Sequence, residues 1–346
     1  MQPRDRGPGF CRALAFAAAA LLLCATGARA AGAPIPHGTV ELVSENQWIA
    51  PGYTIHLGLH FQLEKGWHIY WVNPGDSGEP PHAQWQLPAG ITAGEIEWPT
   101  PRRLGTSSIV DFGYEDGVTL LVPLHAAAAF AAPGPGDTSA QIRGEVKVLV
   151  CREICIAGKA QLSLTLPVKS QAPETNPQPA ELFAAARRAM PRSAPVNWRI
   201  RVTDARDSLQ LFANVGRPVT RVEFFPAVES QINNSEPQQF VAMAGGFRLT
   251  LAKSDQLLKP IARLKGVLVL AGDRGYIIDV PVNKAVAARR DNGGGFDFVA
   301  AGSRVCVTTA VLRQGTALQL AEKVGFQGVG ALAPTISAWL AMGFSP

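Results

Sequence analysis

The sequence lacks the residue patterns on which most enzyme classes depend. No Ser/His/Asp arrangement, pair of carboxylates or glycine-rich phosphate loop stands out along its 346 residues. Hydrolase and nucleotide-binding functions therefore have no support. The chain also lacks a clustered run of basic residues, so we expect no nucleic-acid partner.

Cysteine is scarce, with five residues in the whole chain. Cys11 and Cys24 lie within residues 1–30, which are typical of a secretory signal peptide. That segment has a basic start, an apolar run too short to span a bilayer comfortably, and the small-x-small cleavage site Ala28-Arg29-Ala30. We therefore expect an exported, periplasmic mature protein. Its remaining cysteines are Cys151, Cys155 and Cys306.

Short strand-like runs separated by turn residues dominate residues 34–168. Tyr53–Phe61 alternates between apolar and polar side chains, which is typical of a half-buried strand. Many such strands and little helix predict an antiparallel sandwich of immunoglobulin-like type. Further strands are expected at Trp67–Val72, Ile91–Trp98, Val118–Leu124, Gln141–Val150 and Ala160–Val168.

The rest of the chain divides by composition. Residues 169–195 form a polar, Pro-rich linker with one short helix from Ala180 to Met190. Residues 196–285 return to strand patterns without any cysteine, and we interpret them as a spacer or docking module. The predicted fold class is all-β, with two immunoglobulin-like antiparallel β-sandwich domains joined by that linker. Residues 286–346 form a Gly-rich hinge and an irregular tail, and Cys306 is assigned no role.

The close pair Cys151 and Cys155 follows a strand in which Val146, Val148 and Val150 alternate with other residues. Cysteines that face each other across such a tight connection have Cα atoms about 4.5–5.5 Å apart, which suits a disulfide. A stabilising bond, a redox-exchange pair and a soft-metal site all remain open. Closing so short a loop contributes only roughly 2 kcal/mol, and a domain of this size has core enough without it. Redox exchange is therefore favoured.

Several neighbouring side chains could support this chemistry. A cation beside the sulfurs would stabilise a thiolate, whereas the negative charge of Glu153 would destabilise it. His68 lies in an aromatic run and is expected to be a hydrogen-bonded structural histidine. The candidate cations are Arg152, Lys147 and Arg143, and the possible supporting residues near the cysteines are His68, Tyr70 and Arg152.

Four motifs occur in order along the chain: Gly66–Gly78, Ile96–Pro101, Phe112-Gly113-Tyr114 and Val150–Ile156. Together they resemble the amino-terminal periplasmic domain of the DsbD-like thiol–disulfide interchange proteins. The resemblance is nearest to the ScsB-like branch, which is linked to suppression of copper sensitivity. It is densest over residues 38–168.

This resemblance implies an immunoglobulin-like sandwich with Cys151 and Cys155 as the redox pair. Such a pair takes electrons from a membrane-embedded reductase domain and passes them to thioredoxin-like periplasmic proteins, with no organic cofactor. It also implies a cap loop over the sulfurs, at Asp111–Glu115 in this chain. Phe112 or Tyr114 would then cover the sulfurs. The alternative is that both aromatic residues belong to the core.

Two departures from the family pattern affect what we expect. The cysteines lie closer in sequence than in better-known members, so their local geometry should differ. The chain also lacks the multi-helix membrane domain and the thioredoxin-like domain of full-length members. We expect a relay whose membrane reductase acts in trans or is missing from this chain. The tail after residue 286 would then be truncated or frame-altered, or the protein would be a standalone module.

Two rival functions remain from the sequence. The first is a periplasmic copper-binding or copper-tolerance protein, because Cu(I) prefers thiolate ligands such as the two cysteines could supply. The second is a structural docking module with an inert disulfide. We predict no dedicated metal site.

Overall fold

The computed structural model describes residues 32–105, 109–132, 138–271, 274–284, 295–300 and 303–308. The predicted signal peptide and most of the tail lie outside these residues. Contacts divide the chain into residues 1–284 and 285–346. In the second unit, β20 (Gly295–Ala300) and β21 (Ser303–Thr308) pair as an antiparallel hairpin. No helix among the described residues is long and apolar enough to cross a membrane.

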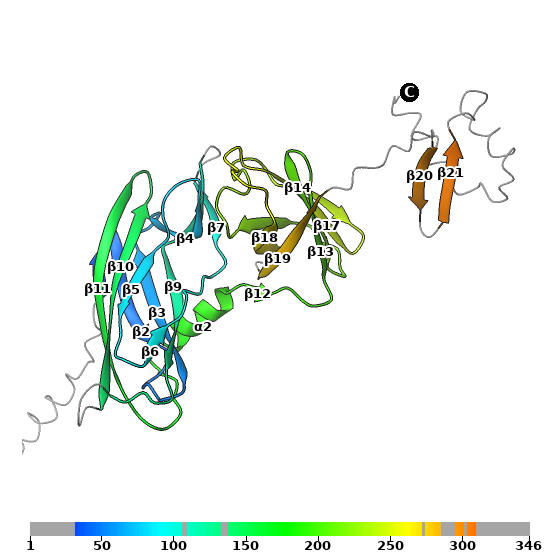
Figure 1. Ribbon diagram of the computed structural model, residues 1–346. Coiled ribbons are helices and arrows are strands. Elements are labelled where there is room, and N and C mark those ends of the chain that lie inside the picture. Colours follow the sequence, from blue (N-terminus) through cyan, green and yellow to red (C-terminus); the bar gives the residue numbers. More distant parts are fainter. Residues whose placement is uncertain are drawn as a thin grey trace, which may run out of the picture. The chain divides into compact units, whose positions relative to one another are not determined.

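The first β-sandwich consists of two sheets, as predicted (Figure 1). One sheet has the strand order β1-β2-β3-β9-β6, and the other has the order β11-β10-β4-β8-β7, with β5 added to β10. All pairs within it are antiparallel. The strands of the first sheet are β1 (Ala33–Ile35), β2 (Gly38–Ser44), β3 (Thr54–Leu63), β6 (Ile91–Ala93) and β9 (Gly117–Ala126). Those of the second are β4 (His68–Gly75), β5 (His82–Gln86), β7 (Arg102–Gly105), β8 (Val110–Glu115), β10 (Ser139–Cys151) and β11 (Cys155–Pro167).

The core of this sandwich follows the alternation seen in the sequence. In β3 the apolar face is buried, while His56 and His60 on the other face are partly exposed. Buried side chains of β10 pack onto the same cluster from the opposite sheet. Burial of apolar surface at roughly 25 cal/mol per Å² is the main stabilising term for such a core. The buried β3 side chains are Ile55, Leu57, Leu59 and Phe61.

The predicted helix is confirmed as α2 (Ala180–Ala189). Its buried Phe183 packs with Leu121 of β9, and its last turn carries Arg187. The Arg187 guanidinium contacts the Glu45 carboxylate at 2.6 and 3.0 Å. This cation near the helix C-terminus complements the helix dipole. The linker helix is therefore held against the first sandwich.

The second β-sandwich also has its own hydrophobic cluster. Its strand order is β15-β18-β19-β13-β14-β17-β16, with β12 beside β19. Most pairs are antiparallel, but β12 and β13 pair with β19 in parallel. The strands are β12 (Arg192–Ser193), β13 (Arg199–Asp204), β14 (Ser208–Asn214), β15 (Val222–Pro226), β16 (Gln239–Met243), β17 (Gly246–Ala252), β18 (Arg263–Leu270) and β19 (Arg274–Lys284).

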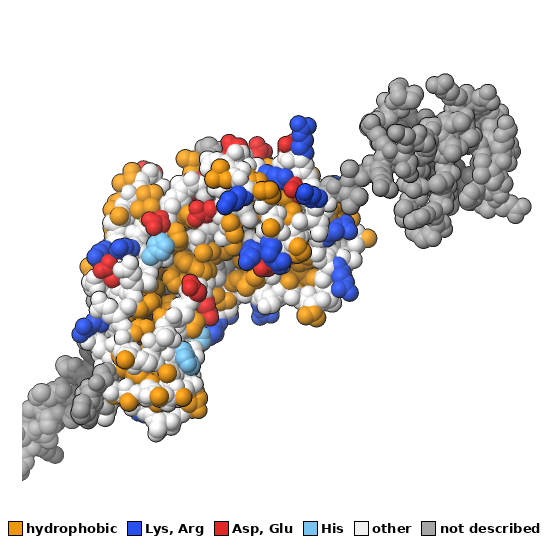
Figure 2. All heavy atoms as spheres, in the orientation of Figure 1, with side chains coloured by type: hydrophobic (Ala, Val, Ile, Leu, Met, Phe, Trp, Pro, Cys, Tyr) orange, Lys and Arg blue, Asp and Glu red, His pale blue; other side chains and the backbone are white. Residues whose placement is uncertain are grey.

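The two sandwiches contact each other within residues 1–284. Phe225 of the second sandwich packs edge-on against Phe112 of the first, with ring centroids 5.3 Å apart. The buried Asn73 side chain donates a hydrogen bond to the Pro226 carbonyl at 2.8 Å. Charged side chains of both signs are interspersed on the face seen in Figure 2. The exact domain boundaries given above stay a prediction.

Candidate functional site

The two cysteines end the long hairpin formed by β10 and β11. The ladder runs without a break from Ser139↔Pro167 to Cys151↔Cys155, and the cysteine Cα atoms are 4.2 Å apart. The cysteines form a disulfide. We expected the strand pattern to resume near Ala160, but β11 begins at Cys155 itself. The residues after Cys155 lack clear alternation, so pairing with β10 defines this strand where the pattern does not.

The two halves of the disulfide differ in exposure. Cys151 is buried, with 2% of its surface accessible, and lies beside His68 of β4 in the ladder. Cys155 is exposed and follows a turn in which Ile154 is also exposed. A thiol–disulfide exchange partner must approach one sulfur in line. The exposed Cys155 is therefore the half of the bond that a partner reaches more easily.

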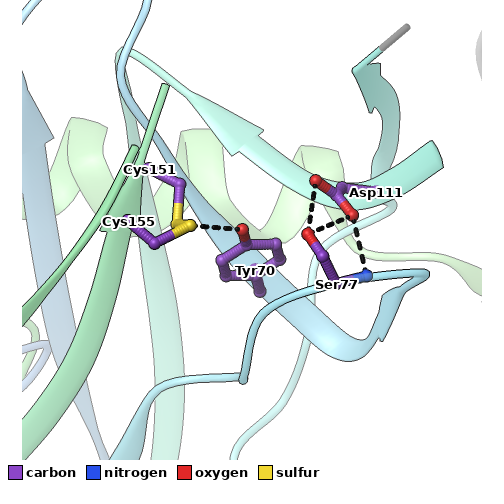
Figure 3. Close-up of a disulfide and its surroundings, with 5 residues drawn as sticks. All are labelled: Tyr70, Ser77, Asp111, Cys151 and Cys155. Carbon is purple, nitrogen blue, oxygen red and sulfur yellow. Dashed lines mark hydrogen bonds between the residues drawn. A yellow bond between two sulfur atoms is a disulfide. The ribbon is translucent and has the colours of Figure 1, made fainter. Parts of the chain in front are cut away.

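Tyr70 contacts this disulfide directly (Figure 3). Its hydroxyl lies 3.4 Å from Sγ of Cys155. A disulfide sulfur carries no proton, so the hydroxyl is the donor. The Tyr70 side chain is fully buried, and this burial raises the pKa of its hydroxyl. Tyr70 therefore keeps its proton and remains a donor at neutral pH.

A buried carboxylate lies behind Tyr70. Asp111 of β8 accepts a hydrogen bond from the Ser77 hydroxyl at 2.9 Å and another from the Ser77 amide at 3.1 Å (Figure 3). Burial raises the pKa of Asp111, while both hydrogen bonds from Ser77 work in the opposite direction. A buried acid with two donors of this kind is held in one place.

His68 differs from its expected role. Its Nε2 is buried and has no hydrogen-bond partner among the described residues, so the expected hydrogen-bonded histidine is wrong for this nitrogen. Its ring packs edge-on against Tyr70, with centroids 5.2 Å apart. Burial lowers the pKa of His68, although the charges of Asp111 and Glu115 act to raise it. The histidine is therefore neutral at neutral pH.

The predicted cap residues occupy a strand. Asp111–Glu115 belong to β8, between β4 and β7, and do not form the expected loop. The loop was expected from the family resemblance, and the strand shows no apolar–polar alternation because it is buried along most of its length. Phe112 packs against Phe225, and the Tyr114 hydroxyl donates to the Pro99 carbonyl at 2.7 Å. Complete burial raises the pKa of Tyr114 well above its usual value. Both rings belong to the buried hydrophobic core of the first sandwich, as the alternative predicted, and a covering role for either ring stays a prediction.

Arg152, one of the candidate cations, faces an aromatic ring. Its guanidinium carbon lies 5.0 Å from the centroid of the Trp67 ring. The His37 ring stacks on Trp67 at 3.6 Å. Such cation–π contacts contribute about 0.5–1 kcal/mol at exposed sites. This stack steadies the turn that joins the cysteines.

The other two candidate cations also have partners of their own. Lys147 lies 4.0 Å from the Glu145 carboxylate, and Arg143 donates to Gln141 at 2.5 Å. Both partners belong to the same strand, β10. Within the described residues, no group of three or more His, Cys, Asp or Glu side chains is placed to hold a metal ion.

Comparisons with known proteins agree with this geometry. Residues 39–167 match the family described as thiol:disulfide interchange protein DsbD, N-terminal. The chain is also similar in fold to the N-terminal periplasmic domain of ScsB from Proteus mirabilis, with 16% identity and a TM-score of 0.55. That match covers 71% of this chain and 94% of the other. No curated protein matches the chain.

Two further solved structures match with low TM-scores. The periplasmic chaperone SfaE has 11% identity and a TM-score of 0.20, covering 70% of this chain and 99% of that chain. The human desmocollin-1 ectodomain has 10% identity and a TM-score of 0.17, and the match covers 67% of this chain and 44% of that chain. These scores are too low to support any argument about the chain.

Proposed function

Because residues 39–167 of this chain form a domain of the DsbD amino-terminal family, we propose that the protein relays electrons by thiol–disulfide exchange. The observation that carries the proposal is a disulfide with one buried and one exposed cysteine, at the tip of a hairpin in that domain. A partner can reach Cys155 while Cys151 stays protected inside the sandwich. A purely structural bond does not need this asymmetry.

The proposed reaction proceeds through a mixed disulfide. In the reduced protein, the Cys155 thiolate attacks one sulfur of the partner's disulfide and releases the other partner sulfur as a thiolate. Cys151 then loses its proton to solvent and attacks Sγ of Cys155. This step re-forms the Cys151–Cys155 bond and releases the first partner sulfur. Two electrons pass to the partner, whose thiolates take up protons from solvent.

The proposed partners follow from the family. Thioredoxin-like periplasmic proteins would accept the electrons, and a membrane-embedded reductase domain, in trans or outside this chain, would supply them. The proposed place of action is the periplasm. The cysteines carry the electrons, so the exchange needs no organic cofactor. Binding of Cu(I) by the reduced pair remains the alternative, and a stoichiometric Cu(I) complex without exchange activity would favour it.

A trapping experiment tests the proposed order of attack. The probe is a thioredoxin-like protein whose resolving cysteine has been replaced and whose remaining cysteine carries a thionitrobenzoate group. The Cys151→Ala variant keeps the exposed Cys155, and we expect it to form a stable mixed disulfide and release coloured thionitrobenzoate. The matched Cys155→Ala variant keeps only the buried Cys151 and should react much more slowly. Equal rates, or no complex with either variant, would contradict the proposal.

A further inference from the structure

The Tyr70 ring packs against a short segment, Asn73–Gly78, which consists of the last three residues of β4 and the three residues that follow. Gly78 lies directly on the ring: a Cβ built at Gly78 would lie 2.1 Å from Cζ of Tyr70. Gly78 also has a φ of 83°, which side-chain-bearing residues rarely adopt. Glycine is therefore the residue that allows this close approach. The backbone of Gly78 therefore limits movement of the Tyr70 ring toward the segment.

The segment is in turn held by β8. Asp76 and Val110 exchange two hydrogen bonds, from the Asp76 amide to the Val110 carbonyl and from the Val110 amide to the Asp76 carboxylate, each 2.9 Å long. The next residue, Ser77, makes the bonds to Asp111 described above. Donors and acceptors on consecutive residues are thus satisfied by one neighbouring strand.

The second sandwich anchors the same segment from the other side. Asn73 donates to the Pro226 carbonyl at 2.8 Å, and the Asn234 side chain donates to the Asp76 carboxylate at 2.8 Å. Both asparagines are buried. A cysteine-free domain thus reaches the segment that fixes Tyr70.

We propose that Tyr70 is a catalytic residue that donates a hydrogen bond to the Cys155 thiolate of the reduced protein. In this proposal the Asn73–Gly78 segment and its anchors in both sandwiches are positioning residues. The proposal rests on the exchange function given above and adds to it the group that stabilises the attacking sulfur. A hydroxyl already in contact with Sγ of the disulfide needs little movement to do so.

The charges around Tyr70 explain why a neutral donor is needed. His68 of β4 is neutral at neutral pH, because burial lowers its pKa.

The other charged groups do not supply such a donor. Asp111 and Glu115 of β8 and Asp76 of the segment are acidic, and a carboxylate destabilises a negatively charged sulfur nearby. Arg152 faces Trp67, and Glu153 is an exposed acid in the turn. The buried hydroxyl of Tyr70 is thus the described donor in contact with the sulfur.

The test compares Tyr70→Phe with the wild type in the reduced, mature protein. The thiol pKa of Cys155 is read from the pH dependence of its alkylation by iodoacetamide. Loss of a hydrogen bond to a charged group should reduce the thiolate fraction about tenfold, which is a rise in pKa of about one unit. The matched control is Tyr53→Phe, which removes the hydroxyl of an exposed tyrosine and should change nothing.

The reduction potential gives a second readout. Well above the thiol pKa, the tenfold loss should make the pair about 30 mV more reducing in Tyr70→Phe than in the wild type. The difference should vanish as the pH falls below the wild-type pKa, because a protonated thiol no longer needs the donor. A purely structural effect of the substitution would not follow this pH profile.

The outcomes separate this proposal from the exchange function. If Tyr70→Phe leaves both the Cys155 pKa and the potential at wild-type values in a folded protein, the role of Tyr70 is wrong, while exchange can still stand. If both shift as expected but neither variant of the trapping experiment forms a mixed disulfide, Tyr70 tunes the pair and the relay function is wrong.

Discussion

At the scale of single residues, the disulfide lies beside two buried side chains, Tyr70 and His68, that remain uncharged at neutral pH. Tyr70 and His68 are both buried, and burial disfavours the charged form of each side chain. The exposed Cys155 is in contact with the tyrosine, while Cys151 is shielded. In the proposed mechanism, this exposure and this hydrogen bond direct the exchange to Cys155.

The buried His68 predicts a loss of stability in mild acid. Its pKa is lowered in the folded state, so the unfolded chain binds a proton at higher pH than the folded chain does. The free energy of unfolding should therefore fall as the pH drops below 6.5, the ordinary pKa of histidine. Urea unfolding at a series of pH values measures this effect.

The matched variants for this prediction are His68→Gln and His82→Gln. The difference in unfolding free energy between wild type and His68→Gln should shrink as the pH falls through this range, because only the wild type must keep His68 neutral. His82 is exposed, and its replacement should leave the wild-type profile unchanged. A pH-independent difference for His68→Gln would show that His68 does not titrate as its burial requires.

The residue scale also shows what the sequence could and could not supply. Cys151 and Cys155 were identified from spacing and from the export signal, and their disulfide is present. The contact between Tyr70 and Cys155 spans 85 positions of the chain, and the bonds from Ser77 to Asp111 span 34. A local sequence pattern cannot predict contacts between residues so far apart in the chain. Tyr70 was predicted as a possible supporting residue near the cysteines, but its contact with Cys155 was not predicted, and Ser77 was assigned no role.

At the scale of structural elements, the Asn73–Gly78 segment matters most. Asn, Pro, Gly, Asp and Ser are typical turn residues, so the composition of this segment favours a turn, although its first three residues end β4. The structure shows that these polar groups bond to β8 and to the second sandwich rather than to solvent. Their residue types suit a turn and a docking segment equally well, so composition alone could not separate the two.

Gly78→Ala should disturb this element in a measurable way. The new methyl group would meet the Tyr70 ring at 2.1 Å, and the φ of 83° would be strained as well. Overpacking of this kind costs about 1–3 kcal/mol. We expect lower stability in thermal unfolding, together with a shift in Cys155 reactivity toward that of Tyr70→Phe.

The control for this variant separates strain from contact. Gly216 has a similar φ of 74°, and a methyl group added there in Gly216→Ala would have no neighbouring atom within 4 Å. It should carry the backbone cost alone and leave Cys155 reactivity unchanged. If the two glycine variants behave alike, the contact with Tyr70 is not what holds the ring in place.

The element scale also explains where strand prediction failed. β3 alternates cleanly and was predicted to within two residues. β8 is buried at five successive positions, so it shows no alternation, and the loop expected over Asp111–Glu115 came from the family resemblance. A central strand whose polar side chain is satisfied by a distant segment cannot be recognised from periodicity.

At the scale of the whole molecule, the second sandwich makes contacts with the first that the sequence did not reveal. Its lack of cysteine and of any motif favoured a spacer or docking module. The structure joins it to the Asn73–Gly78 segment and to β8 through Asn73, Asn234 and Phe225. These contacts link residues more than a hundred positions apart, so only the folded chain reveals them.

Asn234→Ala tests this link between the sandwiches. The variant removes one anchor of the Asn73–Gly78 segment, at a net cost of about 1 kcal/mol for one hydrogen bond. Hydrogen exchange at the Ser77 amide should become about fivefold faster if local opening follows that cost. The exposed Asn214 of the same sandwich provides the control variant, Asn214→Ala, which should leave Ser77 exchange unaltered. Unchanged exchange in Asn234→Ala would mean that the segment is held by β8 alone.

The most direct test of the account is the reduction potential of the Cys151–Cys155 pair in the mature protein. It is measured by equilibration in glutathione or dithiothreitol buffers, followed by trapping of free thiols. We predict a value within the range of known exchange proteins, roughly −270 to −120 mV. A value below about −300 mV would mark a structural disulfide and would contradict the proposed electron relay.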